Sequence, residues 1–297
     1  MNVLRQRIKS LQIVTLNKVY TLFLGNYRSA FKGQGIEFED LREYQPGDNV
    51  KDIDWNTTAK TGRVHIRKFV ETRELKILFL VDVSASMRWS LAVQNLKEKI
   101  VLDSIYLLSQ AALTNHDLIS TMVFADQIQK ELPFKSSRAQ IISVLKTVHR
   151  EFQNQENQKS DLKQVLRHLM QHRQKRLVWF LFTDYIAADD QELEQLLGAF
   201  NRYNDLIIVL ENEDITALKN FDSVVELQDV ESNQVMKLDP ADPKLIQRIN
   251  NDFQKYQEAL RQSLVPKGIS LLWLDHNNDV LLEFSKLFHL RKKRKSY

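Results

Sequence analysis

An uninterrupted apolar run that ends in one acid and two hydroxyls, residues 77–87, most constrains the fold. Its sequence is Ile-Leu-Phe-Leu-Val-Asp-Val-Ser-Ala-Ser-Met. An apolar run without alternation is typical of a strand in a parallel sheet that is covered on both faces. Asp82, Ser84 and Ser86 then follow the carboxyl end of that strand, the edge at which open α/β sheets bind ligands. We expect these three oxygen-bearing side chains to converge on a small, hard cation.

From residue 75 onward, apolar runs alternate with segments of helical periodicity, the pattern of a parallel sheet with crossover helices. We expect strands at residues 75–81, 118–124, 127–132, 177–182, 206–210 and 269–274, and a hairpin at residues 224–238. Helices are expected at residues 91–114, 138–150, 161–172, 190–201, 243–263 and 279–291. The predicted fold class is therefore α/β, a Rossmann-like domain with a mostly parallel central sheet flanked by helices.

The first quarter of the chain predicts a different organisation. Residues 1–24 have the pattern of an amphipathic helix that packs on the body of the protein or on a partner. Residues 25–74 are rich in turn signals and predict a small β-rich module, with short strands at residues 36–38, 50–55 and 63–71. Trp55 is interpreted as a packing anchor between this module and the main domain. We expect two parts, residues 1–74 and residues 75–297, the second with a C-terminal extension.

Composition and charge limit the classes of function. The chain has no cysteine, which excludes thiolate metal sites and a catalytic cysteine. Polar residues interrupt the apolar stretch at residues 11–24, and nowhere do 18 apolar residues follow one another, so we expect no membrane span and a cytoplasmic protein. The basic run at residues 291–295 is interpreted as a solvated helix end whose cations suit the helix dipole, and no nucleic-acid partner is expected.

A second acid strengthens the metal hypothesis. Asp184 follows the apolar strand at residues 177–182, and in a parallel sheet it emerges at the same edge as Asp82. If the two carboxylates lie about 5 Å apart, they repel each other by about 3 kcal/mol at an effective dielectric constant near 20. A divalent cation removes this repulsion. Ser160, which also suits a helix N-cap, is the expected third contributor. Carboxylate and hydroxyl oxygens suit Mg²⁺ best, with Mn²⁺ as an alternative.

Other acids and histidines are weaker candidates. Asp48, Asp52 and Asp54 lie in a turn-rich segment, where acids usually cap loops and pair with neighbouring cations such as Arg42. A pair of histidines spaced four residues apart, His168 and His172, could share a metal ion, but no third ligand is near in sequence. We therefore interpret the acids as structural and do not assign a metal to the histidines.

The sequence favours a protein without enzymatic activity. It has neither a phosphate-binding Gly-x-x-x-x-Gly-Lys loop nor a Gly-x-Ser-x-Gly nucleophile elbow. The alternative is a Mg²⁺-dependent phosphohydrolase with Asp82 as its nucleophile. That chemistry needs a general acid two residues later, where Ser84 stands with a hydroxyl whose pKa is far too high.

The three loops together resemble the metal-ion-dependent adhesion site of the von Willebrand factor type A domain. That site combines an Asp-x-Ser-x-Ser loop with a Thr and an Asp from two further loops. The resemblance assigns metal binding to Asp82, Ser84, Ser86, Ser160 and Asp184, with Ser160 in place of the usual Thr. It also implies that an acidic residue of a partner protein fills the open coordination position.

Upstream motifs resemble one bacterial family, called domain of unknown function 58, whose members carry such a domain. The matching segments are Gly33-x-Gly35-x-Glu37-Phe38, Leu41-Arg42-x-Tyr44-x-Pro46-Gly47-Asp48, Ile53-Asp54-Trp55 and Thr58-Ala59-Lys60. Residues 211–220 depart from the family, which usually has Asp-Pro-x-Glu there. The resemblance implies a metal-dependent adaptor that works with a MoxR-type AAA+ ATPase in a chaperone-like or regulatory role.

Overall fold

The central sheet has six strands, in the order β10-β7-β6-β3-β4-β5. The computed structural model describes residues 18–31, 37–50, 53–70, 74–90, 95–154, 159–171, 176–212, 225–228, 235–239, 242–275 and 277–295. The strands are β3 (Lys76–Asp82), β4 (Leu118–Phe124), β5 (Ile128–Glu131), β6 (Val178–Thr183), β7 (Asp205–Glu211) and β10 (Ser270–Leu274). All neighbours pair in parallel except β4 and β5. The predicted α/β class and mostly parallel sheet are confirmed.

The apolar runs of the sequence form the central strands because both faces of the sheet are covered. Every residue of β6 and β7 is buried, and in β3 only Lys76 is exposed. β3 lies between β4 and β6, so the apolar run that begins at Ile77 is in the interior of the sheet. Its carboxyl end is followed by a short helix, α4 (Ala85–Arg88), which the sequence analysis did not predict.

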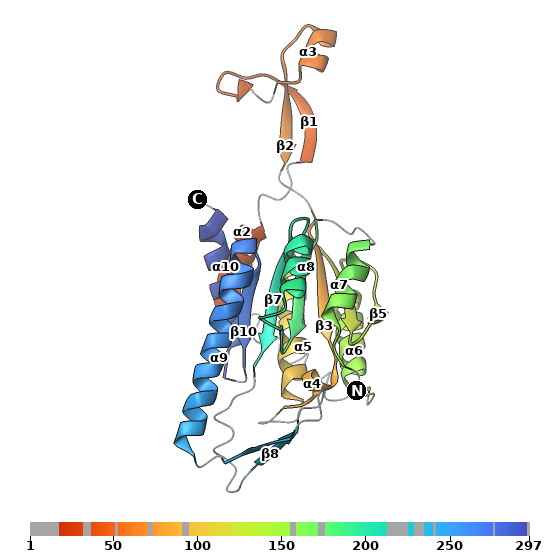
Figure 1. The fold of residues 1–297 in the computed structure, drawn as a ribbon. Coiled ribbons are helices and arrows are strands. Elements are labelled where there is room, and N and C mark those ends of the chain that lie inside the picture. Colours follow the sequence, from red (N-terminus) through yellow and green to blue (C-terminus); the bar gives the residue numbers. More distant parts are fainter. Residues whose placement is uncertain are drawn as a thin grey trace.

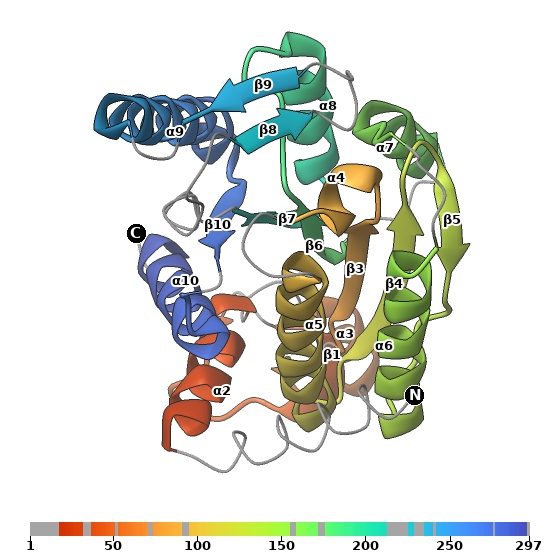
Figure 2. The same cartoon turned by 90° about the horizontal axis from the view of Figure 1, so that it is seen from below.

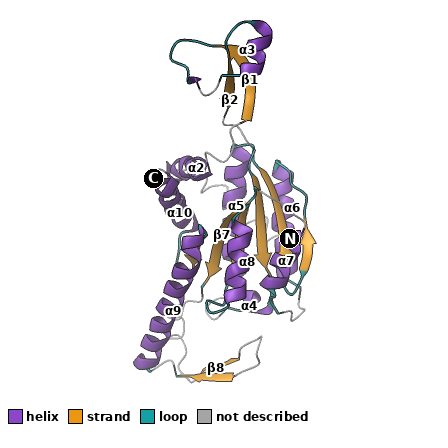
Figure 3. Ribbon diagram, turned by 45° about the horizontal axis from the view of Figure 1, so that its top comes forward, coloured by secondary structure: helices purple, strands orange, loops and turns teal. Residues whose placement is uncertain are grey.

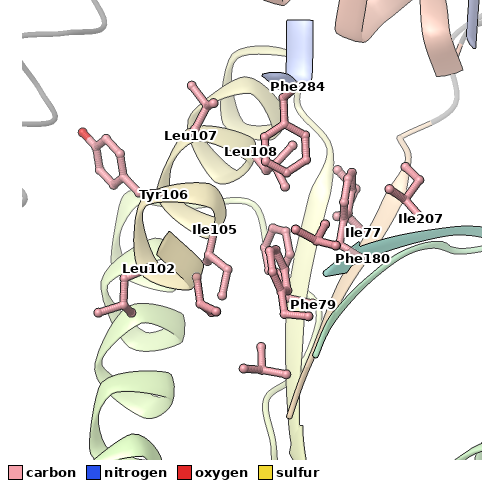
Figure 4. Close-up of a cluster of buried hydrophobic side chains, with 14 of the residues drawn as sticks. Ile77, Phe79, Leu102, Ile105, Tyr106, Leu107, Leu108, Phe180, Ile207 and Phe284 are labelled. Atoms are coloured by element: carbon pink, nitrogen blue, oxygen red, sulfur yellow. The ribbon is translucent and has the colours of Figure 1, made fainter. Parts of the chain in front are cut away.

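Helices form a layer on each face of the sheet (Figure 2). One face is covered by α5 (Leu96–Thr114), α6 (Arg138–Phe152), α10 (Val280–Lys295) and α2 (Lys18–Phe31), and the other by α7 (Leu162–Gln171), α8 (Gln191–Asn201) and α9 (Pro243–Leu264). Figure 4 shows the first core, in which Phe79 and Phe180 of the sheet meet Ile105 of α5 and Phe284 of α10. The second core lies on the opposite face, around the fully buried Trp179.

Helix α2 packs on the body of the protein, which is one of the two arrangements predicted for the N-terminal helix. Phe23, Tyr27 and Phe31 are buried, with ring centroids 5.7, 5.8 and 5.4 Å from that of Phe288 on α10. The helix ends at Phe31 rather than near residue 24, and residues 1–17 of the predicted helix lie outside the described residues. The division of the chain between residues 74 and 75 stays a prediction.

Strands β1 (Glu37–Glu43) and β2 (His65–Val70) pair in an antiparallel manner and, with helix α3 (Trp55–Thr61), stand apart from the sheet on the side opposite to α4 (Figure 1). The strand predicted at residues 50–55 is wrong for the described residues: Ile53 makes only an isolated antiparallel bridge to Ile66, and the Asp54 side chain accepts a hydrogen bond from Thr57 N and starts α3 instead. The Trp55 side chain is 66% exposed, so the predicted packing anchor is also wrong. The structural interpretation of Asp48 is confirmed by its 2.6 Å ion pair with Arg42, whereas Asp52 lies outside the described residues.

The last third of the chain contains the predicted hairpin, formed by the antiparallel strands β8 (Val225–Gln228) and β9 (Val235–Leu238). It lies toward the same end of the molecule as α4 (Figure 3). Among the described residues, no helix is both long enough and apolar enough to cross a membrane. The interpretation of the basic run as solvated is wrong for Arg291, which is only 7% exposed and pairs with Asp205.

Candidate metal centre

The loop after β3 is shaped by hydrogen bonds of its own acid. Asp82 is the last residue of the strand and is 1% exposed. Its Oδ1 accepts a hydrogen bond from Ser84 N at 2.8 Å, which turns the chain into α4. Ser84 holds the N-cap position of that helix without a side-chain capping bond. Its hydroxyl is therefore left for the cluster described next.

The structure brings all five predicted site residues into one connected cluster. The Ser160 hydroxyl, which precedes α7, donates to Asp82 Oδ2 at 2.8 Å. The hydroxyls of Ser84 and Ser86 lie 3.2 Å apart, and Ser86 donates to Asp184 Oδ1 at 3.2 Å. These contacts join the loop after β3, the segment before α7 and the loop after β6 at the carboxyl edge of the sheet. The role of these residues as metal ligands stays a prediction.

Three further residues at this edge were missed from the sequence. The Thr183 hydroxyl donates to Asp82 Oδ2 at 3.0 Å. Lys97 of α5 donates from Nζ to Asp184 Oδ2 at 2.9 Å and to Ser86 O at 3.0 Å. Glu211 ends β7 and is 1% exposed, and no hydrogen bond reaches either of its carboxylate oxygens from the described residues.

Two of the missed residues had a signal in the sequence. Glu211 directly follows the apolar run of β7, as Asp82 and Asp184 follow theirs, so it is a third acid at a strand's carboxyl end. Lys97 lies four and eleven positions from Val101 and Leu108, on the stripe of α5 that faces the core. A cation on such a stripe indicates a buried negative partner.

The electrostatics of the cluster are dominated by burial. The pKa of Asp82 is raised to about 6: burial is the largest cause, the negative charge of Asp184 adds to it, and hydrogen bonds from Ser84 and Ser160 act in the opposite direction. Burial also raises the pKa of Glu211 well above its usual value, against the attraction of Lys97. Both carboxyls are thus held in surroundings that disfavour an uncompensated negative charge.

The donor set fits a hard divalent cation. Two carboxylates and three hydroxyls face one another, and all five groups offer oxygen, the ligand that Mg²⁺ and Mn²⁺ prefer. Over the part of the chain that is described, no three His, Cys, Asp or Glu side chains form a group that could hold a metal ion. The fit therefore depends on the serine hydroxyls together with Asp82 and Asp184. His168 is exposed on α7, and His172 lies outside the described residues.

The fold and the cluster define the class: an α/β protein with an acid and hydroxyl cluster at the carboxyl edge of its sheet. Residues 40–261 match the family described as "Protein of unknown function DUF58". This match covers well over half of the chain, which therefore belongs to that family. The resemblance seen in the upstream motifs is confirmed.

Similar proteins include the uncharacterized proteins Rv1480 of Mycobacterium tuberculosis and Mb1516 of Mycobacterium bovis, each 24% identical over 298 residues that span 96% of this chain and 89% of theirs. Among solved structures, BatB from Bacteroides thetaiotaomicron is 13% identical, with a TM-score of 0.46 over 74% of this chain and 99% of its own. A von Willebrand factor type A protein from Catenulispora acidiphila is 10% identical, with a TM-score of 0.35 over 76% of this chain and 43% of its own. At these scores the two structures add nothing to what the chain's own topology establishes.

Proposed function

We propose that this chain is a non-enzymatic, metal-dependent adaptor that captures a partner protein at the Asp82 cluster. The observation that carries the proposal is the hydrogen-bonded convergence of Asp82, Ser84, Ser86, Ser160 and Asp184 from three separate loops. Asp82 and Asp184 would supply the negative charge and the three serines neutral oxygens. When bound, a divalent cation would supply a positive centre with an open position for a carboxylate of the partner.

Exposed aromatic side chains beside the cluster support a protein partner. Trp89 follows α4 and is 43% exposed, and Tyr185 follows Asp184 and is 62% exposed. The Tyr185 ring stacks on that of Tyr256, with centroids 5.5 Å apart, a contact that restricts its rotation. Aromatic residues that are already ordered are frequent anchors of protein interfaces, because little conformational entropy is lost when they are covered.

The identity of the partner comes from the family resemblance. Members of the family are inferred to work with MoxR-type AAA+ ATPases, and we propose such an ATPase, or a client protein that offers an acidic residue, as the partner. A cytoplasmic location belongs to the same proposal. Recovery of the native protein in the membrane fraction of its host would contradict that location.

The test is direct capture of the purified MoxR-type ATPase of the same host by the immobilised full-length chain. We expect capture in Mg²⁺, loss of capture in EDTA and return of capture when Mg²⁺ is restored. Asp82→Ala should abolish capture. The matched control is Asp126→Ala, because Asp126 is an exposed acid at the same sheet edge outside the cluster. Capture that survives both EDTA and Asp82→Ala would show that the proposal is wrong.

A further inference from the structure

A buried lysine and a buried glutamate accompany the metal centre without belonging to its donor set. The Lys97 side chain is 6% exposed and the Asp184 side chain 13% exposed, and their ion pair measures 2.9 Å between Nζ and Oδ2. Burying an ammonium group is costly unless it is paired and hydrogen-bonded. Lys97 therefore pairs, in this structure, with a carboxylate that the proposed metal site also requires.

The carboxylate of Glu211, at the end of β7, is buried without a hydrogen-bond donor among the described residues. Both Lys97 and Asp184 lie close enough to act on it electrostatically. A buried carboxylate without a donor is rare in folded proteins and calls for an explanation. The charge of Lys97 attracts this carboxylate and partly compensates for its burial.

The acids at this site outnumber the cation that accompanies them. Asp82, Asp184 and Glu211 carry three negative charges when ionised, and Lys97 carries one positive charge, which leaves two negative charges in a buried site. A divalent cation balances that excess, whereas a monovalent cation leaves one charge and a trivalent cation adds one. The charge preference of the site therefore depends on residues that need not touch the metal.

We propose that Lys97 is a tethered counter-cation that competes with the metal for Asp184, and that Glu211 is the charge that holds Lys97 when the metal is bound. The pair sets both the affinity of the site and its preference for a divalent cation. This inference rests on the proposed function, since it concerns the same metal centre. It makes Lys97 and Glu211 positioning residues rather than ligands.

The test is calorimetric titration of Mg²⁺ and, separately, Tb³⁺ into the full-length chain and its variants. Lys97→Met removes the competitor and one positive charge, so Mg²⁺ should bind about tenfold more tightly or better. Glu211→Gln leaves Asp184 as the remaining carboxylate beside Lys97, so Mg²⁺ should bind about tenfold more weakly. The affinity ratio of Tb³⁺ to Mg²⁺ should rise in Lys97→Met and fall in Glu211→Gln. A merely structural role would leave that ratio unchanged.

The controls separate this inference from the proposed function. Lys99→Met replaces an exposed lysine two positions along the same helix and should bind both metals as the wild type does. Lys97→Gln provides a second variant should Lys97→Met fail to fold. If the wild type binds Mg²⁺ and the Lys97 and Glu211 variants bind it equally well, the inference alone is overturned. If the wild type binds no metal, the proposed function and the inference fall together.

Discussion

Strand β7 carries a buried acid at each end, and the two ends differ in how that acid is held. At the amino end, both carboxylate oxygens of Asp205 accept hydrogen bonds from Arg291 at 2.5 Å. Arg291 also donates to the Ser270 hydroxyl at 2.6 Å and lies over the ring of Phe31. At the carboxyl end, Glu211 receives no hydrogen bond from the described residues.

The same contrast extends along the two edges of the sheet. At the amino edge, Asp117 accepts hydrogen bonds from the Tyr27 hydroxyl at 2.7 Å and from Leu75 N at 2.9 Å. At the carboxyl edge, Lys97 forms an ion pair with Asp184 and attracts Glu211, while Asp82 is next to the negative charge of Asp184. The acids of the amino edge are therefore held by protein donors in a structural role, whereas the carboxyl edge gathers three acids around Lys97, an arrangement that a cationic ligand can balance.

The largest effect is expected at the amino edge. Arg291→Met leaves Asp205 buried without its cation, and we expect the free energy of unfolding to fall by about 3–5 kcal/mol. Urea unfolding of the metal-free protein measures this change. Lys293→Met, which replaces an exposed cation on the same helix, should change the value by less than about 0.5 kcal/mol. Equal effects of the two variants would contradict a structural role for Arg291.

Replacing Asp82 is expected to raise the free energy of unfolding of the metal-free protein, in contrast to replacing Arg291. The pKa of Asp82 is about 6 in the folded protein and near 3.8 in the unfolded chain, so the folded state binds the proton more tightly. This contribution is complete below pH 4 and is lost as the pH rises through 6, a fall of about 3 kcal/mol in the free energy of unfolding. In metal-free protein, Asp82→Asn should therefore gain stability relative to the wild type between pH 4 and pH 7. A difference that does not vary with pH would contradict the burial argument.

A smaller loss is expected from Tyr27→Phe. The change removes the hydroxyl that donates to Asp117 and leaves that carboxylate oxygen buried without this donor. We expect the free energy of unfolding to fall by about 1–3 kcal/mol, measured by urea unfolding. Mg²⁺ affinity should be unchanged, because Tyr27 lies at the edge opposite the cluster. A loss of Mg²⁺ affinity together with stability would show that the two edges are not independent.

The smallest change in the free energy of unfolding is expected from a substitution in α3, which stands apart from the sheet together with β1 and β2 (Figure 1). Trp55 begins α3 and is 66% exposed, so Trp55→Ser should change the free energy of unfolding by less than about 0.5 kcal/mol. Tryptophan fluorescence provides a check, because the emission of this side chain should be quenched by iodide. A loss of several kcal/mol would indicate that Trp55 packs on the body after all.

The sequence predicted the sheet well because burial on both faces produces continuous apolar runs. Strand β4 begins and ends at the predicted residues, and α8 and α9 begin and end within one residue of the prediction. The site loops could be located because an acid that follows such a run must emerge at a known edge. Asp82 and Asp184 are then neighbours by topology alone.

The contacts of Lys97 and Arg291 could not be predicted, because they depend on packing between segments that are distant in sequence. Lys97 lies 87 positions before Asp184 and reaches it only because α5 crosses the first face of the sheet. The burial of Arg291 likewise requires α10 to lie beside Asp205, which no local pattern reveals. Trp55 was misplaced because the N-cap of Asp54 outweighs the β propensity of residues 50–55.

Calorimetric titration of Mg²⁺ into metal-free, full-length protein tests the central claim most directly. We predict one Mg²⁺ per chain for the wild type and for Asp126→Ala, and no binding for Asp82→Ala. Circular dichroism of each variant would show that the fold is retained. Absence of binding to the wild type, or unchanged binding to Asp82→Ala, would contradict the assignment of the carboxyl edge as a metal centre.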